Sequence, residues 1–193
     1  MIFQFEIVAM DHSPVDRYFP RKWKLSELKR IVNKWETYMY EHHGWNALYL
    51  ENHDQGRSVS RFASDRPEFR MHSAKMLATF LGLQSGTVFV YEGQELGMAN
   101  MPKTWGIDRL KDLESINFYN EILESECRDN SRTPMQWDST PFAGFSTAQP
   151  WMEMTAKVST WRRAFCFDRD VLDKELRNGE FRCQCDGRQL CCH

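Results

Sequence analysis

The run WNALYL, residues 45–50, is the feature that most limits how this chain can fold. It holds one polar residue, Asn46, and shows no regular alternation of apolar and polar side chains. A strand of this kind is buried on both faces, which is typical of parallel sheets. Parallel strands need crossover connections of a dozen or more residues, and these are usually helices. The run therefore predicts an α/β chain in which helices separate the strands.

Two further strands are predicted, MIFQFE at residues 1–6 and TVFVY at residues 87–91, because both are rich in aromatic and β-branched residues. The resulting order alternates strand and helix, which favours right-handed crossovers and a parallel sheet. Three strands do not make a stable parallel sheet with both faces covered. The chain is therefore either an unusually small α/β domain or part of a larger one.

Three helices are predicted between and after these strands. The first is expected to have Ser26 as its N-cap and to end at Gly44, and its apolar residues recur at helical spacing. The second is expected to carry Pro67 in its first turn and to end near Gly82. Its apolar face is made by Ala74, Leu77, Ala78 and Leu81. A third is expected over residues 107–126.

Composition excludes several classes of partner. The 193-residue chain has a formal net charge of −2 and no basic run, which argues against a nucleic-acid partner. It has no apolar stretch of about 18 residues, so no membrane-spanning helix is expected. The start, MIFQFEIVAMDHSP, lacks the basic region of a signal peptide. A cytoplasmic location is therefore expected.

The six cysteines do not form a recognisable metal or disulfide pattern. Cys127 stands apart, and the other five lie after residue 165. Their spacing lacks the two-residue separation of a zinc knuckle, and a disulfide scaffold would need a secretory context. No metal and no cofactor are expected, and no calcium-binding set of oxygen ligands is seen.

Acidic residues follow all three predicted strands. Glu6 ends the first, the run ENHD at residues 51–54 follows the second, and EGQE at residues 92–95 follows the third. In α/β barrels the active site is built at the carboxyl ends of the strands. Carboxylates with nearby His and Arg suit glycoside chemistry, in which anions stabilise an oxocarbenium-like centre.

Other interpretations of these residues remain open. Asp54 and Arg57 fit equally well a local ion pair that ties the loop down. His53 and Asp54 could form half of a metal site, although no second His-rich strand end supports one. The aromatic content of 13% fits a large core as well as a cleft whose rings stack on sugars.

Four segments together resemble the α-amylase superfamily (glycoside hydrolase family thirteen). They are ENHDQGR at 51–57, GTVFVYEGQELGM at 86–98, SRTPMQWD at 131–138 and AGFSTAQPWM at 143–152. The last two are similar to the oligo-1,6-glucosidase and maltase branch, and the segment KLSELKRIVNKW is similar to fungal-type maltases. The resemblance covers residues 1–152. It implies that this part is the last three strand–helix units of a (β/α)8, or TIM, barrel.

The resemblance also implies roles for individual residues. Asp54 would be the carboxylate that binds sugar hydroxyls and stabilises the transition state. His53 would bind hydroxyls in the same subsite, and Arg132 would contact the same glucose and a neighbouring carboxylate. The expected ligands are α-glucosides of the maltose or isomaltose type.

Four further residues are given supporting roles. Glu51 and Asn52 are expected to position the loop rather than to touch sugar. Gln55 and Arg57 are expected to shape the entrance or to position the loop. Glu92 departs slightly from the branch, where Gln is more usual.

Two catalytic groups of the family have no counterpart in this sequence. The strand MIFQFE resembles the sixth barrel strand, so the nucleophilic Asp and the general-acid Glu would lie before Met1. Nothing marks Glu6 as a substitute acid. The expected function is an α-glucosidase-related fragment that is inactive alone. The alternatives are a non-enzymatic sugar-binding or interaction module and a truncated, unstable gene product.

The resemblance stops at Met152. Residues 153–193 hold five cysteines against one in the preceding 152 residues, which suggests a different origin for this segment. We expect it to be a disordered, non-homologous tail.

Overall fold

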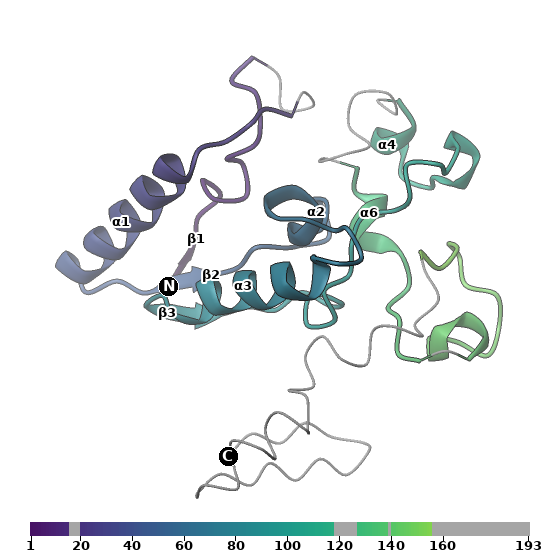
Figure 1. Cartoon of the computed structure of the whole chain (residues 1–193). Helices are drawn as coiled ribbons and strands as arrows, with labels where there is room; N and C mark the ends of the chain where they lie inside the picture. Colours follow the sequence, from purple (N-terminus) through teal and green to yellow (C-terminus); the bar gives the residue numbers. More distant parts are fainter. Residues whose placement is uncertain (16–19, 118–126, 139, 156–193) are drawn as a thin grey trace, which may run out of the picture.

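The computed structural model describes residues 1–15, 20–117, 127–138 and 140–155. Its centre is a three-stranded parallel sheet in the order β1-β2-β3, formed by β1 (Ile2–Phe3), β2 (Asn46–Leu48) and β3 (Gly86–Val88) (Figure 1). Phe3 pairs with Ala47, and Leu48 pairs with Val88. The predicted parallel sheet is confirmed, although each strand is shorter than expected. In β1 the cause is local, because the backbone amide of Glu6 turns back to the Gln4 side chain at 2.7 Å.

The first two predicted helices are present with shifted ends. α1 (Leu25–Glu41) has Lys24 rather than Ser26 at its N-cap position, and the Glu27 carboxylate accepts the Lys24 amide at 2.9 Å. The helix ends before Gly44, whose amide still donates to the Met39 carbonyl at 2.8 Å.

After β2 the chain forms two helices where one was predicted. α2 (Ser58–Phe62) is a short helix that the sequence did not indicate, and α3 (Arg70–Gly82) follows it. Pro67 lies before α3 and outside its first turn. The amides of Phe69 and Arg70 bond to the Arg66 carbonyl, both at 2.9 Å, so a turn precedes the helix.

The third predicted helix, 107–126, is wrong over residues 107–112 and confirmed over residues 113–117. The structure has a 3-10 turn η1 (Ile107–Arg109) and a short helix α4 (Leu113–Asn117), and residues 118–126 lie outside the described part. The interruption has a tertiary cause. The backbone amides of Lys111 and Asp112 donate to one carboxylate oxygen of Asp129, at 2.7 and 3.0 Å, instead of continuing a helix.

Two short elements complete the described chain. They are α6 (Asp129–Arg132) and the 3-10 segment η2 (Pro141–Gly144). Figure 1 shows α6 beside α2. No helix among the described residues is long and apolar enough to cross a membrane. Most of the 153–193 segment, whose disorder was expected, lies outside the described residues.

One face of the sheet packs against helices. Leu48 and Leu50 of the second strand segment are buried with residues from α1, α2 and α3. The core cluster comprises Ile7, Met10, Ile31, Leu48, Leu50, Val59, Ala74, Leu77 and Leu81. The apolar faces predicted for the first two helices are therefore the faces that are buried in the core.

The opposite face of the sheet is aromatic and open. Phe3 lies 4.8 Å from Phe89 and 5.5 Å from Tyr49, measured between ring centroids. Phe3, Phe5 and Phe89 are 46%, 61% and 37% exposed. No described element covers these rings. The described part of the chain thus has a one-sided core and an exposed aromatic sheet face.

Tyr49 should make the free energy of unfolding decrease as the pH becomes alkaline. Burial raises the pKa of its hydroxyl from about 10 to about 12. The unfolded chain therefore loses this proton first as pH rises. Stability from Tyr49 is complete below pH 10 and is lost between pH 10 and pH 12.

We expect Tyr49→Phe to weaken this alkaline loss, which urea unfolding at pH 9 to 12 would measure. The variant should be at least as stable as wild type at pH 7, because the Tyr49 hydroxyl is buried without a hydrogen-bond partner in the described structure. Tyr40→Phe, at a residue that is 86% exposed, is the control and should keep the wild-type decline. An equally steep decline in Tyr49→Phe would contradict the assignment.

Candidate functional site

The loop after β2 is pinned at both ends by Glu51. One oxygen of its carboxylate accepts the amide and the hydroxyl of Ser58, at 2.9 and 2.6 Å. The other accepts Arg57 at 3.1 Å, and neither side chain of this ion pair has any exposed surface. Because both ends are fixed by one buried carboxylate, the loop between them is held in place, with His53 and Asp54 toward the surface and Gln55 buried.

His53 and Asp54 are the exposed residues of this loop. The Asn52 side chain accepts the Asp54 amide at 2.9 Å, which closes a local turn. The His53 and Asp54 side chains are 69% and 45% exposed, and His53 Nε2 lies 3.3 Å from Asp54 Oδ2. The loop therefore presents an imidazole and a carboxylate side by side.

Arg132, the last residue of α6, binds this loop although it lies far along the chain. Its Nε donates to the His53 carbonyl at 2.8 Å, and one terminal nitrogen donates to Asp54 Oδ1 at 3.1 Å. The other terminal nitrogen donates to Asp112 at 3.1 Å. The structure thus brings together His53, Asp54 and Arg132, which the resemblance had assigned to one subsite.

The structure adds three residues that sequence reasoning missed. Arg128 lies 3.5 Å from Asp54 and 2.9 Å from Glu114, and it also approaches Asp112 at 3.9 Å. The spacing RDNSR was a usable signal, because side chains four residues apart lie on the same side of a helical turn. No sequence signal pointed to Asp112 or Glu114, because both fell inside the predicted third helix.

The charges around Asp54 nearly balance. Two arginines face three carboxylates, and Asp112 and Glu114 are 11% and 18% exposed against 45% for Asp54. Asp54 Oδ1 receives both arginines, while Oδ2 lies next to His53. The site can therefore offer a fixed carboxylate oxygen and an imidazole to a ligand that carries hydroxyl groups.

Gln55 and Arg57 do not line an entrance. They are 7% and 0% exposed, and Gln55 donates to the Val8 carbonyl at 3.4 Å. The alternative ion pair between Asp54 and Arg57 is also not formed, since Arg57 pairs with Glu51 and Asp54 with the two α6-side arginines. Both buried residues act within the loop rather than at its surface.

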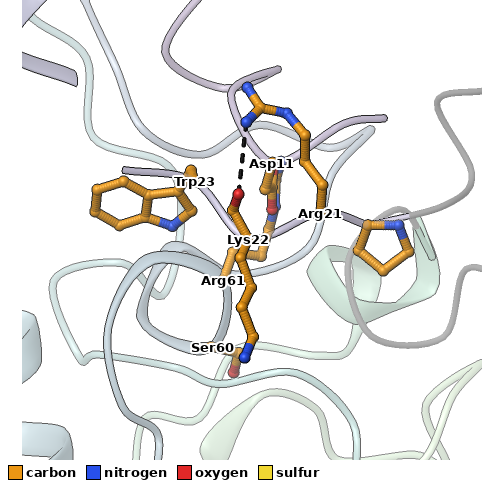
Figure 2. A pocket seen from close by; sticks show the side chains of 7 residues that line it. Asp11, Arg21, Lys22, Trp23, Ser60 and Arg61 are labelled. Atoms are coloured by element: carbon orange, nitrogen blue, oxygen red, sulfur yellow. Dashed lines mark hydrogen bonds and ion pairs between the residues drawn. The ribbon is translucent and has the colours of Figure 1, made fainter. Parts of the chain in front are cut away.

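A separate pocket of about 320 Å³ lies beside α2 and is shown in Figure 2. Two of the positively charged side chains that line it already pair with carboxylates. Arg61 pairs with Asp11 and donates to the Val8 carbonyl at 2.6 Å, and Arg21 pairs with Glu27 at 3.1 Å. Among the described residues, no cluster of three His, Cys, Asp or Glu side chains could hold a metal ion.

The family model for the catalytic domain of alpha-amylase matches residues 1–164. This range covers most of the chain and includes every residue of the site. The chain belongs to the alpha-amylase family. The resemblance stated from the four sequence segments is therefore confirmed. The domain boundary expected at Met152 stays a prediction.

Curated relatives support the same branch. An alpha-glucosidase of Schizosaccharomyces pombe is 43% identical over an alignment of 183 positions, and the match covers 85% of this chain and 32% of the relative. An oligo-1,6-glucosidase of Parageobacillus thermoglucosidasius is 43% identical over an alignment of 166 positions, and the match covers 79% of this chain and 29% of the relative. The chain thus spans about a third or less of these relatives.

Solved structures agree in fold. Trehalose-6-phosphate hydrolase of Bacillus licheniformis superposes with a TM-score of 0.75 at 40% identity, over 80% of this chain and 30% of that one. An isomaltulose synthase mutant of Erwinia rhapontici, solved with D-glucose, gives 0.70 at 38% identity over 78% and 29%. The described chain is an α/β part of an alpha-amylase catalytic domain.

Glu51→Gln should destabilise the fold strongly, because it leaves the Arg57 charge buried without its partner. We expect the free energy of unfolding to fall by about 3–5 kcal/mol in urea titrations. Glu6→Gln is the control, because Glu6 and its partner Lys34 are 36% and 52% exposed. That exposed pair should contribute at most about 1 kcal/mol. Equal losses in the two variants would contradict the structural role of Glu51.

Proposed function

We propose that this chain is part of an α-glucosidase-like glycoside hydrolase and carries one half of a glucose subsite. In this proposal the three strands are the last three of a (β/α)8 barrel. The ligands are α-glucosides of the maltose or isomaltose type. The supporting observation is the contact of 3.1 Å between Arg132 and the exposed carboxylate of Asp54.

The open sheet face supports the barrel part of the proposal. β1 and β3 each have one unpaired edge in the described sheet, and Phe3, Phe5 and Phe89 are exposed on one face. In a closed barrel the interior is filled by layers of side chains from several strands. Further strands of the same barrel would cover both edges and this face. The relatives, about three times longer, have enough residues to supply such strands.

Asp54 is proposed to bind hydroxyls of the glucose ring and to stabilise positive charge in the transition state. Both arginines contact Oδ1, which fixes the direction of Oδ2. His53 beside Oδ2 adds a second hydrogen-bonding group on the exposed side. Anionic oxygens suit this task because glycoside cleavage passes through an oxocarbenium-like state.

The remaining steps of hydrolysis require groups other than these. A retaining mechanism needs a nucleophile and a general acid about 5–5.5 Å apart. Asp112 and Glu114, the carboxylates that share arginines with Asp54, are each paired with arginine. We therefore propose that the nucleophile and acid belong to parts of the domain that this chain does not span. A sugar-binding module without turnover is the second candidate, since the subsite geometry alone would support it.

Glucose binding tests the subsite directly. We expect the chain to bind glucose weakly in titration calorimetry, and Asp54→Asn to weaken that binding about tenfold or more, because it loses a charged hydrogen-bond acceptor. Asp108→Asn makes the same chemical change at an exposed carboxylate outside the site and should bind as wild type does. Equal binding by wild type and Asp54→Asn would contradict the proposal.

Turnover tests the proposed division of catalytic groups. The chain alone should hydrolyse a chromogenic α-glucoside no faster than its Asp54→Asn variant does. Activity should appear when the chain is combined with the part of the domain to which the proposal assigns the nucleophile and the acid. Hydrolysis by the chain alone that Asp54→Asn abolishes would show that the chain holds its own nucleophile and acid.

A further inference from the structure

Arg57 contacts three separate segments with one guanidinium group. One terminal nitrogen donates to Glu51 at 3.1 Å and to the Glu92 carbonyl at 2.6 Å. The other donates to the Ser131 carbonyl at 3.4 Å. These acceptors lie after β2, after β3 and within α6. Arg57 therefore joins the segments that surround the exposed site.

The aromatic ring of Tyr91 reinforces this junction. The Arg57 guanidinium lies 5.3 Å from the ring centroid, and the Tyr91 hydroxyl donates to the same Ser131 carbonyl at 3.0 Å. The Ser131 hydroxyl in turn donates to the Gln55 carbonyl. Arg57 thus holds one carbonyl of α6 to the loop after β2, and Tyr91 holds the same carbonyl to the segment after β3.

The position of this carbonyl matters because of its neighbours in sequence. Ser131 directly precedes Arg132, and Arg57 lies three residues after Asp54. The contact between Asp54 and Arg132 is therefore accompanied by further connections between the same two segments. Arg57 donates to the Ser131 carbonyl, and the Ser131 hydroxyl donates to the Gln55 carbonyl. Movement of α6 away from the loop would break these bonds as well.

We propose that Arg57 is a positioning residue that fixes the distance between Asp54 and Arg132. This inference rests on the proposed glucose subsite for its functional meaning. This role also requires a guanidinium group at position 57. A planar guanidinium can donate in several directions at once, whereas a lysine ammonium is a single point on a flexible stem. Lysine keeps the charge opposite Glu51 but cannot reach both carbonyls.

The test compares Arg57→Lys with Arg61→Lys. Arg61 is a matched control, since its side chain is also without exposure, lies in α2 and pairs with a carboxylate, Asp11. Arg61 donates to Asp11 and to the Val8 carbonyl, and neither acceptor belongs to α6. Both substitutions should lower the urea midpoint. Only Arg57→Lys should disturb the site.

Hydrogen exchange followed by mass spectrometry gives a readout that needs no sugar. Arg57→Lys should raise exchange about tenfold in two peptides, one spanning residues 51–58 and one spanning 127–132, because it removes charged hydrogen bonds between them. Arg61→Lys should leave the 127–132 peptide at its wild-type rate. Unchanged exchange at 127–132 in Arg57→Lys, or an equal rise in both variants, would overturn the proposal.

Glucose titration separates this inference from the proposed function. Arg57→Lys should weaken glucose binding about tenfold, and Arg61→Lys should not. If wild type binds no glucose, the proposed function fails, while the exchange result still decides whether Arg57 couples the two segments. If Arg57→Lys does not fold, the double variant Glu51→Gln, Arg57→Gln replaces it, because it removes both buried charges together. This variant also lacks the guanidinium that donates to Ser131. Exchange at 127–132 should rise severalfold, and no rise would overturn the proposal.

Discussion

Glu51 and Arg57 place two opposite charges where solvent does not reach them, and the site is built on that pair. An isolated charge in such a position would be strongly unfavourable, so each residue requires the other. Glu51 also receives both polar groups of Ser58, which begins α2. Within the short segment between them, Gln55 is buried and His53 and Asp54 face outward. Exposure of His53 and Asp54 is therefore a consequence of what is buried beneath them.

The same arrangement explains how residues distant in sequence come to share a site. Parallel strands deliver their following loops to one edge of the sheet, which places the segments after β2 and β3 together. α6 is added to this edge through its backbone, at the Ser131 carbonyl, rather than through an apolar face. Arg128 and Arg132 then point to the same carboxylates because they are one helical turn apart.

Part of this structure was predictable from local pattern. The apolar run WNALYL predicted a parallel sheet correctly, although Trp45 is 52% exposed, and helical spacing found the buried faces of α1 and α3. Strand and helix ends were less predictable, because they depend on contacts such as that of Glu6 with Gln4. The third helix failed for a related reason. Asp129, far along the chain, takes the backbone amides that a helix would have used.

The residues of the site were likewise predictable only in part. His53, Asp54 and Arg132 were selected by resemblance to a family, and the structure places them in contact. Arg57 was expected at an entrance or in a loop-positioning role, and burial excludes the entrance. No local pattern could show this, because the Glu92 and Ser131 carbonyls that receive its guanidinium lie 35 and 74 residues away. Arg128 had a usable spacing, but its partners Asp112 and Glu114 became visible only once the chain was folded.

A crystal structure of the chain, determined from crystals soaked in glucose, would test most directly the central claim that Asp54 and His53 bind a glucose ring. The account predicts one glucose ring at the loop after β2, with hydroxyl oxygens about 2.5–3.0 Å from the Asp54 carboxylate and hydrogen-bonded to His53. Arg132 should keep its contact with Asp54 when the sugar is bound. A glucose ring bound elsewhere, with the Asp54 carboxylate left free of sugar, would contradict the account.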